Sequence, residues 1–165
     1  MCTLVSNGLY KLNQIGIEFL IQNRCQIVNN LEINKYDSRP MYYAMKSDKD
    51  ENVLYLLPLT TIRSKSQENR IDSCLMSKGI QKCYYEKVKI LGVQRVVKIS
   101  SVFAVSINMI EEWTINGTIY VVKNRNKIVS IQKKLKVMLS HYASNSSHSE
   151  NHVIELRNQL INKNR

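Results

Sequence analysis

Residues 39–70 have the sequence RPMYYAMKSDKDENVLYLLPLTTIRSKSQENR, and the expected fold is built outward from them. Two apolar, aromatic-rich runs, 41–46 and 53–59, flank a charged insert, which predicts a β-hairpin. The second run is almost continuously apolar, as in a strand that is covered on both faces. Because Pro58 has no amide hydrogen, we expect this strand to bulge or leave its ladder there. The hydroxyl pair that follows is then expected at an exposed strand end.

The segment after this strand combines hydroxyl and cationic side chains: Thr60, Thr61, Arg63, Ser64 and Lys65. Single-stranded RNA can be cleaved without a metal, because its own 2′-hydroxyl can attack the neighbouring phosphorus. The products are a 2′,3′-cyclic phosphate and a 5′-hydroxyl. The protein must supply a proton acceptor, a proton donor and positive charge for the transition state. These side chains offer such groups together, although a solvated polar loop has the same composition.

The positive charge is concentrated in the second part of the chain. The protein has 24 basic and 13 acidic residues, a net charge of +11. Residues 71–165 hold 15 of the basic and 6 of the acidic residues, with basic runs at Lys78–Lys98 and Lys123–Lys136. A surface of one sign attracts polyanions, so we expect nucleic acid as the partner. The alternative is a basic face that only keeps the protein soluble. A membrane-surface role is disfavoured, because no helix backs a basic face with Trp and Phe.

The N-terminal part predicts one strand and one helix. Residues 3–10 can form a short strand, and Asn13 is a suitable N-cap for a helix that ends near Cys25. The expected inner face of this helix comprises Ile15, Phe19 and Leu20. A further short helix is expected at 67–75.

The middle of the chain predicts a second hairpin. Residues 83–90 and 93–99 alternate between apolar and polar residues around a turn at Leu91-Gly92. Residues 102–105 are expected to be extended, 106–113 to form a short helix, and 118–122 to form a strand after the Asn-Gly turn.

The clearest helical periodicity lies near the C-terminus. Its apolar positions recur at intervals of three and four residues: Ile128, Ile131, Leu135, Met138 and Tyr142. A Ser/Asn-rich linker is expected at 143–149 and a last helix at 150–162, packed through Val153, Leu156 and Leu160. The whole pattern predicts one α+β domain spanning residues 1–165.

No metal or membrane signal accompanies these elements in the sequence. The four cysteines, Cys2, Cys25, Cys74 and Cys83, are far apart, and the three histidines all lie after residue 140. Zinc sites need closely spaced ligand pairs, so we expect reduced thiols, solvated histidines and no cofactor. The absence of a long apolar run and of a basic-then-apolar start predicts a cytoplasmic protein.

The order of several motifs resembles the type III toxin–antitoxin toxins, the ToxN/AbiQ-like endoribonucleases, especially the CptN-like branch. The likeness spans roughly residues 9–142. It rests on an early tyrosine, the RPMYYA strand, the Leu-Pro-Leu-Thr-Thr end of the second strand, the KILGVQRVVKI hairpin and the segment Val102-Phe103-Ala104-Val105. This chain has Thr61 where that family more often has Ser, and Ala104 where that branch often has Pro.

The resemblance implies roles for particular residues. Thr61 falls on the family's catalytic hydroxyl, with Thr60 beside it. Arg63 or Lys65 would be the nearby cation, and Tyr10 an active-site tyrosine. The residues expected to contact RNA are Arg39, Ser64, Lys82, Lys87, Lys89, Arg95, Lys98, Lys123, Arg125, Lys127, Lys133, Lys134 and Lys136. Without the resemblance, Tyr10 and Trp113 are expected in the core.

The resemblance also implies an activity, a fold and a partner. The activity is metal-independent endoribonuclease cleavage of single-stranded RNA, including mRNA, with growth arrest or phage abortive infection as the outcome. The fold is a twisted antiparallel sheet, an SH3-like partial barrel flanked by helices. The partner is an inhibitory RNA pseudoknot made from tandem repeats, held in a closed toxin–RNA oligomer. Two alternatives remain open: a MazF/Kid-like type II toxin with a protein inhibitor, and a non-catalytic RNA- or DNA-binding module.

Overall fold

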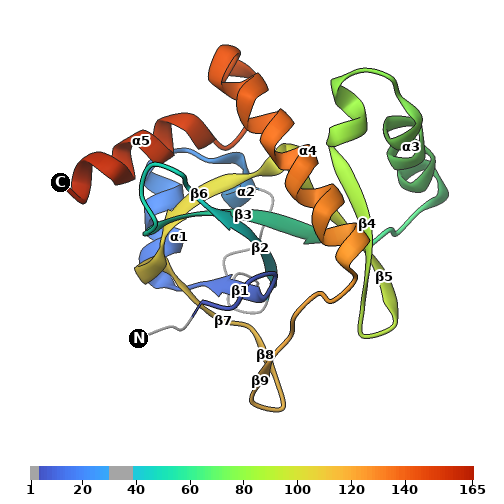
Figure 1. Cartoon of the computed structure of the whole chain (residues 1–165), viewed down its shortest axis with the longest axis horizontal. Helices are drawn as coiled ribbons and strands as arrows, with labels where there is room; N and C mark the ends of the chain where they lie inside the picture. Colours follow the sequence, from blue (N-terminus) through green and yellow to red (C-terminus); the bar gives the residue numbers. More distant parts are fainter. Residues whose placement is uncertain (1–3, 30–38) are drawn as a thin grey trace.

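The computed structural model describes residues 4–29 and 39–165 as an α+β fold (Figure 1). Within these residues, seven strands form one antiparallel sheet in the order β4-β5-β3-β2-β1-β7, and β6 pairs with β3 off this path. The strands are β1 (Leu9–Leu12), β2 (Met41–Lys46), β3 (Val53–Thr60), β4 (Tyr85–Ile90), β5 (Val93–Lys98), β6 (Phe103–Ser106) and β7 (Ile110–Glu112). The sheet is open rather than a closed barrel.

The predicted first hairpin is confirmed as β2 and β3. Tyr42 pairs with Leu57, and the register shifts between Tyr43 and Met45, where a bulge lets the strands twist. All of β3 from Val53 to Leu59 is buried, as its continuous apolar pattern predicts.

As the missing amide predicts, β3 leaves its ladder at Pro58, although the strand itself continues to Thr60. One edge of β3 pairs with β2 as far as Pro58. The other edge pairs with β6 up to Leu56 and then with β5 from Leu59. Pro58 therefore lies between the β6 ladder and the β5 ladder on this edge of β3. Its missing amide hydrogen removes no hydrogen bond from either of these two ladders.

Helices flank the sheet, as expected. They are α1 (Gln14–Gln22), α2 (Gln26–Asn29), α3 (Lys65–Met76), α4 (Arg125–Ser144) and α5 (Val153–Lys163). Figure 1 shows α4, in orange, crossing the sheet and α3 lying beyond the β4–β5 hairpin. Helix α4 contacts β4, and α5 contacts β6 and β3. The buried residues of α4 are Ile131, Leu135, Met138 and Tyr142, so its predicted apolar face is confirmed.

Helix α1 begins as predicted, and Phe19 and Leu20 of its predicted inner face are buried. The Asn13 side chain accepts a hydrogen bond from the Gly16 amide at 3.0 Å. Ile15 is 55 % exposed, so its predicted inward position is wrong, whereas Gly16 and Ile17 are buried. Gly16 approaches η4 (Ile107–Met109) so closely that a Cβ there would lie 2.4 Å from the Met109 carbonyl oxygen.

The segment after β6 is the largest error in the expected elements. The predicted helix over 106–113 is limited to the 3₁₀ turn η4, and the chain then forms β7, because the edge of β1 accepts it as a partner. The strand predicted at 118–122 is reduced to β9 (Thr118–Ile119), which pairs with β8 (Thr114–Ile115). The first strand starts at Leu9 rather than at residue 3, which lies outside the described residues.

Candidate functional site

A cavity of about 600 Å³ lies where the end of β3 meets the β4–β5 hairpin. Its polar lining comprises Arg39, Thr60, Thr61, Arg63 and Arg95. Its apolar lining comprises Pro40, Leu59, Ile90, Leu91, Val93 and Trp113. This volume lies within the range of ordinary ligand sites. We call this space the arginine cavity.

Strand pairing explains why these residues meet. Thr60 pairs with Val96 of β5, so the segment that follows β3 lies beside Arg95. Arg95 donates a hydrogen bond from Nη1 to the Thr61 hydroxyl. Arg39 donates from Nη2 to the Leu59 carbonyl at 2.8 Å, which ties the start of β2 to the end of β3. Arg39, Arg95 and the threonine pair are therefore tied to the sheet, whereas Arg63 lies in the exposed segment between β3 and α3.

The charge inside the arginine cavity has one sign. Its described lining holds three guanidinium groups and no carboxylate. Guanidinium groups stay protonated and match the oxygens of phosphates or carboxylates. The described lining therefore has the charge that suits an anion, and the two threonines add hydroxyls that both donate and accept hydrogen bonds.

Two of the predicted catalytic residues, Tyr10 and Lys65, do not line the cavity, and neither does Ser64 beside them in the prediction. Tyr10 is completely buried, and its hydroxyl accepts a hydrogen bond from the Val5 amide at 2.7 Å. Ser64 caps α3 by accepting from the Gln67 amide at 3.1 Å. The Lys65 side chain is 79 % exposed and pairs with Glu68 at 3.4 Å. Sequence spacing could not separate Ser64 and Lys65 from Thr61 and Arg63, because the turn into α3 determines which of these residues face the cavity.

A second cavity of about 360 Å³ collects part of the predicted RNA-binding surface. Its lining includes Lys87 and Lys89 of β4, with Lys123, Asn124 and Lys127 at the start of α4. Lys89 and Lys123 are exposed, and so is the neighbouring Arg125. We call the lining of this cavity, together with the neighbouring Arg125, the lysine groove. The two separate basic runs of the sequence therefore meet in space, as a shared surface requires.

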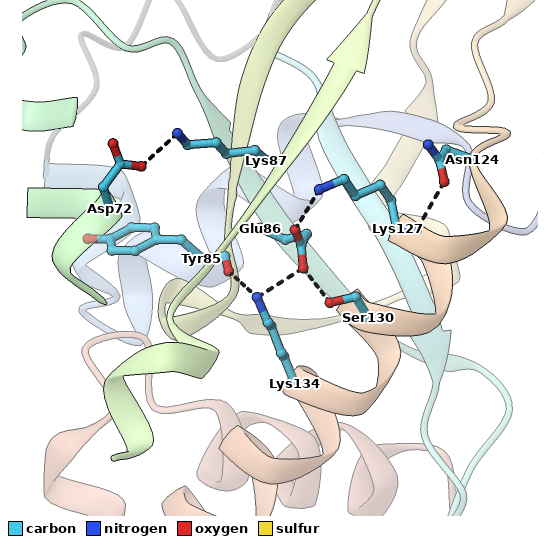
Figure 2. Close-up of polar contacts among 8 residues, drawn as sticks. All are labelled: Asp72, Tyr85, Glu86, Lys87, Asn124, Lys127, Ser130 and Lys134. Atoms are coloured by element: carbon cyan, nitrogen blue, oxygen red, sulfur yellow. Dashed lines mark hydrogen bonds and ion pairs between the residues drawn. The ribbon is translucent and has the colours of Figure 1, made fainter. Parts of the chain in front are cut away.

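A buried glutamate that the sequence analysis missed neutralises part of this charge (Figure 2). The Glu86 side chain is 9 % exposed and accepts ion-paired hydrogen bonds from Lys127 at 3.0 Å and Lys134 at 2.9 Å. The Ser130 hydroxyl donates to the same carboxylate, and Lys134 also donates to the Tyr85 carbonyl at 2.9 Å. Burial raises the pKa of Glu86, but these hydrogen bonds outweigh it and hold the pKa below its usual range.

The strand pattern contained the signal for this glutamate. Glu86 occupies the same alternating face of β4 as the buried Val88 and Ile90. An acid on an apolar face needs cationic partners, and the basic stretch 123–136 supplied them. Lys87, on the opposite face, pairs with Asp72 at 2.6 Å.

The remaining predicted RNA-binding residues are distributed over the surface. Lys82, Lys133 and Lys136 are exposed. Lys98 is half-buried and lines a small cavity of about 130 Å³ with Arg39, which also lines the arginine cavity. The predicted cations therefore do not come together in a single site.

The described residues contain no group of three or more metal-ligating side chains. Cys25, Cys74 and Cys83 are free thiols; Cys2 lies outside the described part of the chain. His141 Nε2 and His148 Nδ1 approach within 3.2 Å of each other, away from the cavity. In the part of the chain that the structure describes, no helix is long and apolar enough to cross a membrane.

Comparison with known proteins gives no family assignment. No model of a known protein family matches the chain, and no curated protein sequence is significantly similar to it.

Proposed function

We propose that the protein is an endoribonuclease that cleaves single-stranded RNA in the arginine cavity without a metal ion. The observation that carries this proposal is that Arg39, Arg63 and Arg95 line one cavity with Thr60 and Thr61, and that Arg95 donates a hydrogen bond to the Thr61 hydroxyl. Phosphoryl transfer is catalysed mainly by positioning and by positive charge around the phosphorus, and this lining offers both.

In the proposed reaction the RNA supplies its own nucleophile. The 2′-oxygen bonds to phosphorus, the bond from phosphorus to the 5′-oxygen breaks, and the proton of the 2′-hydroxyl ends on the leaving 5′-oxygen. The guanidinium groups stabilise the negative charge of the pentacoordinate phosphorus. The Thr61 hydroxyl, oriented by Arg95, exchanges protons with the reacting oxygens. Tyr10 and Lys65 have no part in this step, because neither lines the cavity.

The proposed inhibitor is an RNA pseudoknot made from tandem repeats, in a closed toxin–RNA oligomer. Two lines of reasoning support this partner: the ordered resemblance to type III toxins and the cationic lysine groove. The groove presents Lys89, Lys123 and Arg125 as exposed positive charge, which suits a folded RNA backbone.

The test of cleavage compares Thr61→Ala with Thr61→Ser on a single-stranded RNA in the presence of a chelator. We expect the wild type and Thr61→Ser to leave 5′-hydroxyl and 2′,3′-cyclic phosphate ends. Thr61→Ala should lose at least about 100-fold in rate, the typical contribution of a positioned proton-transfer group, while RNA binding persists.

The outcome distinguishes the alternative readings. Wild-type protein that binds RNA but produces no such ends is a binding module, and cleavage by the proposed mechanism is then wrong. The absence of carboxylate and imidazole groups from the described cavity lining makes this the strongest alternative. Inhibition of a cleaving enzyme by a small protein rather than by an RNA would place it with the type II toxins.

A further inference from the structure

The lining of the arginine cavity consists of two chemically different groups of residues, which we call its polar half and its apolar half. One half presents the guanidinium and hydroxyl groups, and the other presents Ile90, Leu91, Val93 and Trp113. Val93 and Arg95 are two residues apart on β5, so their side chains leave the same face of the strand about 7 Å apart along it. A phosphate held by the arginines would therefore place the adjoining part of the same ligand against the apolar half.

Two residues of the apolar half, Leu91 and Val93, are exposed to water, whereas Ile90 is buried. Leu91 is 59 % exposed and Val93 is 48 % exposed. Apolar surface in water is unfavourable, and exposed apolar residues that line a cavity mark a place where a ligand can cover them.

The conformation of Leu91 strengthens this point. The β4–β5 turn has positive φ at both central residues, 53° at Leu91 and 75° at Gly92. The β8–β9 turn has nearly the same angles, 52° and 79°, with the favoured pair Asn116-Gly117. A leucine is disfavoured at such an angle, where asparagine is preferred. The Leu91 amide donates to the Tyr120 hydroxyl at 3.4 Å, which helps to hold the turn at the cavity mouth.

We propose that the apolar half of the arginine cavity holds an unpaired nucleobase, covered by Leu91 and Val93 and stacked on Trp113. This inference rests on the proposed function, because it names the part of a single-stranded RNA that enters beside the phosphate. Stacking on aromatic side chains is how single strands are held, since unpaired bases expose their faces. The expected ligand is an unpaired nucleotide that is bound through both its base and its phosphate.

Trp113 reports directly on the site because it is the only tryptophan in the protein. The probe is a short 2′-O-methyl oligoribonucleotide, which cannot be cleaved because the attacking hydroxyl is blocked. We expect it to quench the tryptophan fluorescence on binding. An abasic oligonucleotide of the same length and charge should produce little quenching and bind about tenfold more weakly per lost stacked base.

Leu91→Asn is the informative variant, because asparagine suits the turn and removes the apolar side chain. We expect about tenfold weaker binding of the base-containing probe and unchanged binding of the abasic probe. Ile21→Asn is the matched control: Ile21 is 48 % exposed on α1, does not line the cavity, and should leave both affinities unchanged.

Equal quenching and affinity for the two probes, or full affinity in Leu91→Asn, would show that no base occupies this half. That result leaves the cleavage test intact, because cleavage is measured separately on natural RNA. Conversely, base-dependent binding without any cleavage product would uphold the base site and overturn the endoribonuclease proposal.

Discussion

Glu86 is a buried carboxylate whose contacts predict a large contribution to the stability of the protein. Its carboxylate joins β4 to α4 through Lys127, Ser130 and Lys134. Removing one partner of a buried charge cluster leaves the others without compensation, which costs about 3–5 kcal/mol. Glu86→Gln should lower the free energy of unfolding by an amount of this order, measured by urea denaturation at pH 7.

The control for this change is Glu111→Gln. Glu111 is 56 % exposed and lies 3.7 Å from Lys11, so its loss should change stability by less than about 1 kcal/mol. Equal effects of the two substitutions would contradict the role assigned to Glu86.

The same glutamate predicts a pH dependence. Because the pKa of Glu86 is lower in the folded protein than in the unfolded chain, its contribution to stability is complete above the unfolded pKa. The contribution is lost as the pH falls through the lowered pKa of the folded protein and the carboxylate becomes protonated. We compare about pH 6 with about pH 3, because this range brackets an ordinary carboxyl pKa. Over this range the wild-type protein should lose more unfolding free energy than Glu86→Gln does. Parallel pH profiles for the two proteins would contradict this.

At the scale of elements, the close packing of Gly16 predicts that alanine there lowers stability, which is the opposite of what helix propensity predicts. Alanine is favoured over glycine inside a helix by about 1 kcal/mol. A Cβ at position 16, however, would lie 2.4 Å from the Met109 carbonyl oxygen, a backbone atom that cannot move aside cheaply. Gly16→Ala should therefore destabilise the protein, by about 1–3 kcal/mol, as overpacking does.

Gly79→Ala is the comparison for this prediction. The nearest atom to a Cβ at position 79 is the Ser77 hydroxyl oxygen at 3.8 Å, which is ordinary contact. This variant should unfold at nearly the wild-type temperature in a thermal melt. A stabilised Gly16→Ala would mean that α1 and η4 are not packed as closely as described.

The elements that the sequence predicted correctly share a strong local signal. Helix α4 has a long apolar period, and the two main hairpins alternate or are continuously apolar around clear turns. The failures all depend on neighbours that are distant in sequence. Residues 110–112 form a strand because β1 offers an edge, and Ile15 faces outward because Gly16 takes the close contact with η4.

The candidate site divides in the same way. The position after an apolar strand predicts a site at Thr60, Thr61 and Arg63. These three residues do line a cavity with Arg39 and Arg95. Trp113 and Leu91 could not be assigned to that cavity, because only the packing of two hairpin ends brings them there. Lys127 and Lys134 could not be separated from the exposed lysines until the position of Glu86 was known.

At the scale of the whole molecule, the pairing of charges predicts which lysines affect salt-dependent RNA binding. Each phosphate contact that is lost should reduce the slope of log affinity against log salt by about 1. Lys89→Ala and Lys123→Ala should each do so, because both side chains are exposed in the lysine groove.

Lys134→Ala and the pair Lys133→Glu with Lys136→Glu complete this series. Lys134 is held by Glu86, so its loss should lower stability and leave the salt slope nearly unchanged. Lys133 and Lys136 are exposed, and their reversal should weaken RNA binding if α4 contributes to it. An unchanged slope in every exposed-lysine variant would mean that this surface serves solubility rather than binding.

The exchange of partners along β3 has a consequence for how the protein matures during synthesis. Strand β3 is fixed by β2, β5 and β6, and the arginine cavity is lined by residues from Arg39 to Trp113. Chains fold from the N-terminus as the ribosome releases them, and long-range strand pairing is slow. The threonine pair at the end of β3 must therefore wait for 36 more residues, those after Thr61 up to Val97 (97 − 61), before its neighbours in β5 exist. A ribosome-bound fragment that stops short of β5 carries the hydroxyls but cannot assemble the cavity around them.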